Sequence, residues 1–149
     1  MGAKTTVDSR PYCYNVSGAD RYRHNRGSVV AIKYHLIWIP RRRRPVLTGK
    51  VADRLEQLLR EKAKEIGVQI EHLAIQPDHL HLFVSAPPSL AVSQIVFRLK
   101  GYTARVLRQE FPVLRRMPSM WTTSYFCSTA GNVSQATIQR YIEAQSTRE

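Results

Sequence analysis

The stretch that decides the fold is "VQIEHLAIQPDHLHLFVSAPP", residues 68–88. Apolar and polar residues alternate over its second half, so that His79 and His81 face one side of a strand while Leu80 and Leu82 face the other. The first half is also strand-like, and the short Pro-Asp turn between the halves predicts that they pair as a hairpin. The sequence therefore predicts a hairpin with one apolar face for the core and two imidazoles on the opposite face.

The segments that flank the hairpin predict the rest of the fold. "SVVAIKYHLIWIP", residues 28–40, is rich in β-branched and aromatic residues and predicts a strand near the centre of a sheet. "TGKVADRLEQLLREKAKEIG", residues 48–67, carries apolar side chains at helical spacing and predicts a helix that Gly67 closes. Beyond the hairpin, the expected elements are a long helix over 90–111, a strand over 121–129 and a final helix over 130–145 capped by Asn132.

These elements follow the order strand, helix, strand, strand, helix, strand, helix. That order predicts the fold class α+β, with an antiparallel sheet and helices packed on it. A chain of 149 residues fits a single domain, which we expect over residues 28–149. Residues 1–27 are polar and interrupted by glycines, and they predict a poorly defined N-terminal extension with at most a short strand near residues 12–16.

The charge of the chain is strongly unbalanced. It has 23 lysine and arginine residues against 11 aspartate and glutamate residues, a net charge of +12. Such an excess favours a polyanionic partner, which means nucleic acid or, less often, a membrane surface. No window approaches the ~20 apolar residues of a membrane span, and the N-terminus lacks the apolar segment of a signal peptide. Cys13 and Cys127 are too few and too far apart to predict a disulfide scaffold or a zinc knuckle, so we expect a cytoplasmic protein.

The histidine pair admits two interpretations. Imidazoles at positions i and i+2 of a strand stand side by side, close enough to share one metal ion. His79 and His81 can equally be ordinary polar residues on a half-exposed face of the sheet. Two imidazoles are too few for a catalytic metal, so the metal interpretation needs a third ligand from elsewhere. His72, on the preceding strand, is one candidate.

The final helix offers a better candidate. Tyr141 and Gln145 are four residues apart and therefore share a helix face. Tyr141 supplies a phenol that can act as a nucleophile, and Gln145 supplies a neutral oxygen ligand. Ile138, Tyr141 and Ile142 can also simply pack on the sheet as the apolar side of an amphipathic helix. The spacing alone leaves both possibilities open.

Taken in order, these motifs resemble those of a known family. "PDHLHLFVSAPP", followed by the terminal "YIEAQ", is similar to the HUH-type single-tyrosine transposases of the IS-200/IS-605 insertion sequences. "YHLIWIPRRRRPVL", "FRLKGYTAR" and "W…SYFCSTAGN" match in the same order, so that the resemblance extends over roughly residues 30–145. The first 27 residues carry none of it.

The resemblance implies a ferredoxin-like or RRM-like HUH fold and a role for each candidate residue. His79 and His81 match the metal-binding histidines of the family, Tyr141 its nucleophile and Gln145 its third metal ligand. The implied cofactor is a divalent metal ion, Mg²⁺ or Mn²⁺. The implied reaction cleaves and rejoins single-stranded DNA through a 5′-phosphotyrosine, and the implied ligands are hairpins near the element ends. The family is dimeric, which implies a homodimer with possible composite active sites that combine histidines of one chain with the tyrosine of the other.

Basic residues are candidates for contacts to the phosphates of DNA. The set that we expect to bind DNA follows the first strand and continues on the long helix: Arg41, Arg42, Arg43, Arg44, Arg98, Lys100 and Arg105, with Arg108, Arg115 and Arg116 further along. A basic run is often only a solvated loop. Aromatic residues belong more often to the core, but four of them are candidates for stacking on bases: Tyr102, Trp121, Tyr125 and Phe126.

Two other functions fit parts of this pattern. A domesticated relative that acts on repeated palindromes in its host genome would share the chemistry, and its usual mark is a longer or basic C-terminal tail. A non-catalytic nucleic-acid-binding regulator would need neither the histidines nor the tyrosine. Because four residues follow Gln145, we expect the mobile-element transposase. We also expect a dimer, since the long apolar first strand would need a partner across an edge of the sheet.

Overall fold

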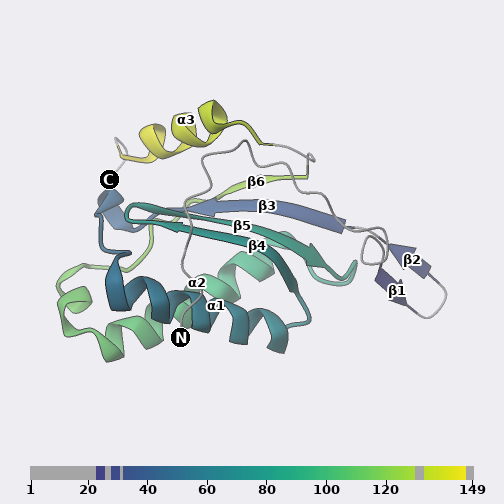
Figure 1. Ribbon diagram of the computed structural model, residues 1–149, viewed down its shortest axis with the longest axis horizontal. Coiled ribbons are helices and arrows are strands. Elements are labelled where there is room, and N and C mark those ends of the chain that lie inside the picture. Colours follow the sequence, from purple (N-terminus) through teal and green to yellow (C-terminus); the bar gives the residue numbers. More distant parts are fainter. Residues whose placement is uncertain (1–22, 26–27, 31, 130–132, 147–149) are drawn as a thin grey trace.

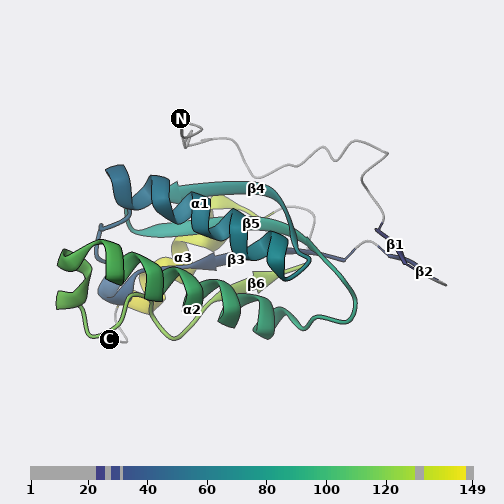
Figure 2. The ribbon, with the colours of Figure 1, turned by 90° about the horizontal axis from the view of Figure 1, so that it is seen from below.

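The computed structural model describes residues 23–25, 28–30, 32–129 and 133–146. Its main sheet has four antiparallel strands in the order β4-β5-β3-β6. Figures 1 and 2 show α1 and α2 on one face of this sheet and α3 on the other. The elements in chain order are β1 (Arg23–Asn25), β2 (Ser28–Val30), β3 (Ile32–Trp38), η2 (Arg41–Arg43), α1 (Gly49–Glu65), β4 (Gln69–Gln76), β5 (His79–Ala86), α2 (Val92–Glu110), η3 (Pro112–Arg116), β6 (Phe126–Ser128) and α3 (Gln135–Ser146).

From β3 onward the elements follow the predicted order, and the predicted α+β class is confirmed. The expected hairpin is β4 and β5, which pair from Gln76 and His79 outward. A register shift between Ile70 and His72 marks a β-bulge in β4. The bulge interrupts the simple alternation of inward and outward side chains along β4. Within the described part of the chain, no helix is long and apolar enough to cross a membrane.

The expected first strand is divided in two. Its start, β2, pairs with β1 in a separate two-stranded sheet, whereas β3 lies in the main sheet between β5 and β6. The prediction of a central strand is therefore confirmed for β3. The expectation that this strand needs a dimer partner across an edge was wrong, because neighbours in the same chain pair with both of its edges. The expected short strand near residues 12–16 lies outside the described residues.

Two boundaries near the C-terminus differ from the prediction. The last strand covers Phe126–Ser128 rather than all of 121–129, because the residues before it form a loop whose backbone oxygens accept hydrogen bonds from a side chain of α2. Helix α3 begins at Gln135 rather than near residue 130. The Oγ of Ser134 accepts a hydrogen bond from the backbone N–H of Thr137 at 3.1 Å, so Ser134 is the N-cap. The predicted cap, Asn132, lies outside the described residues.

Apolar side chains on the two faces of the sheet form two clusters of different size. The larger one fills the space between the sheet, α1 and α2, and it includes Leu80 and Leu82 of β5. Gly67, with a positive φ of 79°, ends α1 as predicted and turns the chain into β4. The smaller cluster holds α3 to the sheet and consists of Ile37, Ile39, Val133, Ile138 and Ile142. Full burial of one such side chain contributes about 1.5–3 kcal/mol, so α3 is held much less strongly than the other two helices.

Candidate active site

The two histidines of β5 lie on the sheet face that α3 covers. His81 pairs with Ile37 of β3, and directly paired residues point to the same face. Ile37 belongs to the cluster beneath α3, whereas Leu80 packs in the larger core on the other side. His79 is two residues from His81 and shares its face. The alternation in the sequence therefore predicted the orientation of both histidines correctly.

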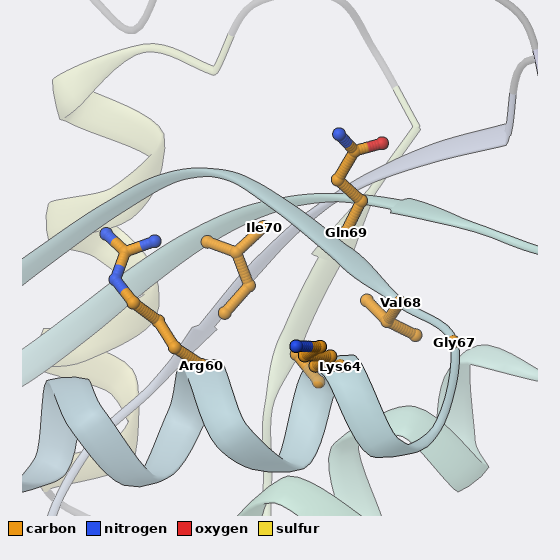
Figure 3. Close-up of a pocket in the computed structure, with 7 residues that line it drawn as sticks. Arg60, Lys64, Gly67, Val68, Gln69 and Ile70 are labelled. Carbon is orange, nitrogen blue, oxygen red and sulfur yellow. The ribbon is translucent and has the colours of Figure 1, made fainter.

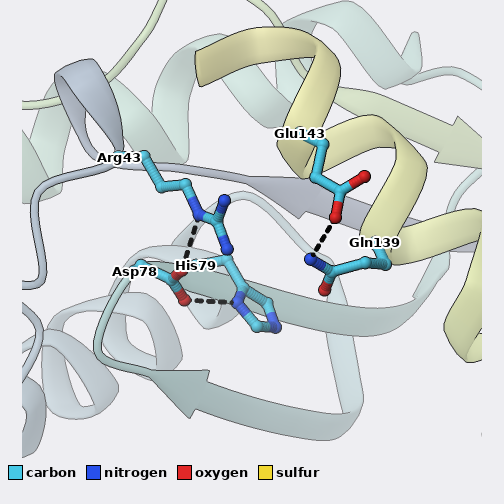
Figure 4. A network of polar contacts seen from close by, with 5 residues as sticks. All are labelled: Arg43, Asp78, His79, Gln139 and Glu143. Atoms are coloured by element: carbon cyan, nitrogen blue, oxygen red, sulfur yellow. Dashed lines mark hydrogen bonds and ion pairs between the residues drawn. The ribbon is translucent and has the colours of Figure 1, made fainter.

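His79 is held by the turn that precedes it. Its Nδ1 lies 2.9 Å from Asp78 Oδ1, and Arg43 Nε donates to Asp78 Oδ2 at 2.8 Å (Figure 4). Burial raises the pKa of Asp78, but the hydrogen bonds from His79 and Arg43 outweigh it and hold that pKa below its usual value. Because Asp78 is ionised and can only accept, the hydrogen in this contact belongs to His79 Nδ1.

His81 is completely buried beside another histidine that the sequence interpretation did not single out. Its Nε2 lies 3.1 Å from Nδ1 of His35, and the two rings are parallel to within 2°. The pKa of His81 is lowered to about 3, mainly by burial and further by the charges of His35, His72 and His79. The imidazole is therefore neutral, which is the form that binds metal ions.

Tyr141 and Gln145 share one hydrogen-bonding partner. Ser124 Oγ donates to Gln145 Oε1 at 2.8 Å and lies 3.0 Å from the Tyr141 hydroxyl. A serine hydroxyl has a single hydrogen, which here goes to the amide oxygen, so the phenol of Tyr141 must donate to Ser124. The i, i+4 spacing thus places both side chains on the face of α3 that meets the sheet, as the sequence predicted. Gln145 is 8% exposed.

Lys100 fixes the loop that carries Ser124. Its Nζ donates to the backbone oxygens of Thr122 and Ser124, the second at 3.2 Å. The lysine thereby connects α2, on one face of the sheet, to the loop that contacts α3 on the other. This residue is one of the predicted DNA contacts, and its ammonium has an internal task in this structure.

The four predicted site residues share a face of the sheet but form two groups. We call His79 and His81 the histidine half, and Tyr141 and Gln145 the tyrosine half. The Tyr141 ring lies against Phe126 of β6, with ring centroids 5.9 Å apart. Strand β3 separates β6 from β5, and neighbouring strands are about 4.8 Å apart, so the strand that Tyr141 contacts lies about 10 Å from the strand that carries the histidines.

The donor atoms present suit a divalent ion. Among the described residues, no three His, Cys, Asp or Glu side chains are arranged to hold a metal, but two imidazoles and one amide oxygen would form a neutral set of three. His79 donates through Nδ1, which leaves the lone pair of its Nε2 for a metal. Ser124 occupies only one of the two lone pairs of Gln145 Oε1. His81 would have to exchange its contact with His35 for the ion.

The predicted DNA-binding residues have different surroundings. Arg43 and Lys100 have the internal partners described above, and Arg41 donates to Ser119 Oγ at 3.2 Å. Arg105 lies over the Tyr102 ring, with its guanidinium carbon 5.6 Å from the ring centroid. Most of the aromatic candidates are partly buried, and Trp121 is part of the main core. The exposed members of the predicted basic set are Arg42, Arg44, Arg98, Arg105, Arg115 and Arg116.

An open hollow lies elsewhere, between the last turns of α1 and the start of β4 (Figure 3). It contains none of the predicted site residues. The side chains of Arg60 and Lys64 border it, and Arg60 also forms an ion pair with Glu56 at 3.1 Å. The complete lining consists of Arg60, Ala63, Lys64, Gly67, Val68, Gln69 and Ile70.

The sequence interpretation missed three residues that contact the predicted site. Asp78 was read only as a turn residue, although an aspartate directly before a candidate ligand is a recognisable signal for a histidine partner. His35 required the strand register, because only the pairing of β3 with β5 brings it to His81. Ser124 carried no local signal, since it reaches α3 from a loop 17 residues before Tyr141.

Comparisons with known proteins identify the family to which the chain belongs. The family model described as "Transposase IS200 like" matches residues 28–145. The ISDra2 transposase TnpA of Deinococcus radiodurans is 38% identical over 130 residues, which cover 85% of this chain and 93% of that protein. The transposase of insertion sequence element IS200 from Salmonella typhimurium is 30% identical over 116 residues, covering 76% of each chain.

Solved structures show the same fold. A crystal structure of a transposase from Deinococcus radiodurans superposes with a TM-score of 0.75 at 38% identity and covers 83% of this chain and 97% of that one. A REP-associated tyrosine transposase bound to a REP hairpin shares the fold at a TM-score of 0.52 and 12% identity, over 75% of this chain and 62% of that one. The matching family is one of DNA-processing enzymes. The chain belongs to the IS200-like transposase family.

Proposed function

We propose that this transposase cleaves and rejoins single-stranded DNA at the hairpin-bearing ends of an insertion sequence, with Tyr141 as the nucleophile. One observation carries the proposal: the tyrosine helix lies on the same face of the sheet as the histidine pair. Family membership supports the DNA substrate. We take residues 28–149 as the transposase domain and residues 1–27 as an extension outside it.

In the proposed reaction, the phenolic oxygen of Tyr141 attacks a DNA phosphorus. The bond from that phosphorus to the 3′ oxygen breaks, giving a 5′-phosphotyrosine and a free 3′-OH. The phenol loses its proton and the leaving 3′ oxygen gains one, so the step balances. Joining to a new end is the reverse reaction. The energy of the phosphodiester is kept in the phosphotyrosine, which is why no external energy source is required.

His79, His81 and Gln145 are the residues that would hold a divalent ion. Mg²⁺ or Mn²⁺ would neutralise the charge of the phosphate and polarise its phosphorus. Neutral nitrogen ligands bind Mn²⁺ more tightly than Mg²⁺, whereas the higher abundance of Mg²⁺ in cells favours occupation of the site by Mg²⁺. The tyrosine half would then have two tasks: Gln145 would anchor α3 at the ion, and Tyr141 would present its oxygen to the phosphate.

The separation of the two halves across β3 favours a homodimer with composite sites as a second part of this proposal. In a composite site, the histidine half of one subunit would receive its tyrosine half from the partner subunit. Mixing His79→Ala and Tyr141→Phe chains tests this. A composite site predicts restored cleavage in the mixture, because one of its sites would contain both intact halves. Cleavage that stays absent in proven mixed dimers would show that each site is built within one chain.

Tyr141→Phe is the direct test of the nucleophile. The substitution removes the attacking oxygen and leaves the ring against Phe126, so we expect no covalent adduct at any metal concentration while hairpin binding survives. The adduct is trapped with labelled single-stranded element ends and Mn²⁺, and mass spectrometry of the digested protein locates it. A nucleotide on another tyrosine would refute the assignment, and hairpin binding with no adduct in the unaltered chain would indicate a non-catalytic regulator.

A further inference from the structure

The network formed by Arg43, Asp78 and His79 connects the arginine loop to the histidine half. Figure 4 shows all three side chains converging from η2 and from the turn before β5, with α3 crossing nearby. Arg43 Nε to Asp78 Oδ2 is 2.8 Å, and Asp78 Oδ1 to His79 Nδ1 is 2.9 Å. Each carboxylate oxygen thus has its own partner, and both contacts are partly shielded from water, since the three side chains are 17–32% exposed.

The contact between Asp78 and His79 decides which nitrogen of His79 can bind a metal. An ionised carboxylate accepts hydrogen bonds and cannot donate them, so Nδ1 of His79 carries the ring hydrogen. In the neutral imidazole, the lone pair is then on Nε2, which points away from Asp78. Without Asp78 the ring would be free to place its hydrogen on Nε2, where it would block a metal ion.

The contact between Arg43 and Asp78 keeps the carboxylate in place. Arg42 and Arg43 both have positive φ angles, 58° and 54°, in a region that non-glycine residues seldom occupy. Such a conformation is energetically unfavourable and persists only where surrounding contacts require it. The Arg43 side chain gains a contact to an ionised carboxylate in return, and such charge-assisted bonds are stronger than neutral ones.

We propose that Asp78 and Arg43 are positioning residues for metal binding, acting on His79 in sequence: Arg43 holds Asp78, and Asp78 fixes the tautomer and direction of the His79 ring. Arg43 then differs in function from the exposed Arg42 and Arg44 beside it, although all belong to one arginine run. This inference rests on the proposed role of His79 as a metal ligand. It assigns to Arg43 a task other than the DNA contact that the sequence predicted.

The experiment measures Mn²⁺ affinity without DNA, by electron paramagnetic resonance of free Mn²⁺, for the full chain and its variants. Asp78→Asn should weaken Mn²⁺ binding by roughly 10-fold or more, the range for lost partners of metal ligands. Arg43→Ala should weaken it by a smaller factor, and Arg43→Lys should restore part of the loss. Arg44→Ala, the matched control from the same run, should leave Mn²⁺ affinity unchanged.

The double variant provides the sharpest readout. If Arg43 acts only through Asp78, Arg43→Ala should have no further effect on Mn²⁺ affinity once Asp78→Asn is present. Binding of single-stranded DNA in EDTA should be unchanged by Arg43→Ala, whereas loss of a phosphate contact would reduce the salt slope by about 0.7. Additive losses of Mn²⁺ affinity, or a DNA-binding defect of Arg43→Ala with normal Mn²⁺ affinity, would overturn the proposal.

Two further measurements keep its failure distinct from that of the proposed function. Nitrogen chemical shifts of the His79 ring report its tautomer without any metal, and Asp78→Asn should move the hydrogen from Nδ1 to Nε2 in a chain that is still folded. An unchanged tautomer would overturn the proposal. His79→Ala should abolish tight Mn²⁺ binding. If His79→Ala binds Mn²⁺ normally, His79 is not a metal ligand, and the positioning role of Asp78 and Arg43 is wrong as well. If His79→Ala loses Mn²⁺ binding but Asp78→Asn and Arg43→Ala bind normally, only the positioning role is wrong.

Discussion

The histidine half and the tyrosine half of the site rest on different supports. His79 and His81 belong to β5, which pairs with β4 on one side and β3 on the other and buries its apolar face in the larger core. Tyr141 and Gln145 belong to a helix held by the small cluster of residues 37, 39, 133, 138 and 142 and by the hydroxyl of Ser124. The histidine half is therefore rigid, and the tyrosine half is the one that local opening can release at low cost in free energy.

This contrast separates the expected effects of substitutions. Changes in the histidine half should alter metal binding and the stability of the sheet. Changes in the tyrosine half should alter the chemical step or its metal requirement and leave the sheet intact.

Removing either histidine should have the largest effect. His79→Ala or His81→Ala should abolish cleavage but leave hairpin affinity nearly unchanged, because metal binding and basic-surface binding use different side chains. Cleavage and gel-shift assays on the same folded preparations measure the two properties. His81→Ala should also lower the thermal midpoint more than His79→Ala, since His81 is completely buried and His79 is not. Parallel loss of binding and cleavage in a folded variant would contradict the metal assignment.

Gln145→Ala should have an intermediate effect. It removes one neutral ligand and leaves the nucleophile, so cleavage should fall and be partly rescued by excess Mn²⁺. Titration of adduct formation with Mn²⁺ measures the shift in metal requirement. Glu143→Ala, on an exposed position of the same helix, provides a comparison for general damage to α3. A defect that no Mn²⁺ concentration reduces would mean that Gln145 acts in helix packing rather than as a ligand.

Lowering the pH should destabilise the metal-free protein through the histidine half. The pKa of His81 is about 3 in the folded chain against 6.5 for an unperturbed histidine, so between these values the unfolded chain binds a proton that the folded chain excludes. The contribution is complete above the upper value and is lost progressively as the pH falls. Urea unfolding in EDTA from about pH 7 to about pH 5 measures it. His81→Gln should show a shallower dependence, and equal slopes in both proteins would contradict the assignment.

The sequence predicted those parts of the site that depend on local periodicity. Alternation in a strand placed His79 and His81 on one face, and helical spacing placed Tyr141 and Gln145 together. The contacts between elements were not predictable in the same way. His35 reaches His81 only through the register of two strands far apart in the chain, and that register depends on the packing of the whole sheet.

The extent of the last strand was not predictable for a related reason. "WTTSYFCST" has the composition of a strand throughout, but Lys100 of α2 donates hydrogen bonds to the backbone oxygens of Thr122 and Ser124. A tertiary hydrogen bond thus overrides local β propensity there. The same override leaves Ser124 in a loop, where its hydroxyl can reach the tyrosine half.

Ser124→Ala should produce the smallest effect on activity. Whether adduct formation becomes faster or slower distinguishes two roles for that serine. A hydrogen bond contributes about 0.5–1.5 kcal/mol to stability, so losing the contacts to Tyr141 and Gln145 should lower the unfolding free energy by about 1 kcal/mol. Those contacts hold the phenol over β6, with its hydrogen directed to Ser124 and away from β5. If they restrain the tyrosine half, their removal should speed adduct formation by up to about fivefold, the rate equivalent of 1 kcal/mol. Single-turnover kinetics at saturating Mn²⁺ measure this, with the exposed neighbour Thr123→Ala as the control. Slower adduct formation in a folded Ser124→Ala chain would show instead that Ser124 holds the productive geometry of the nucleophile.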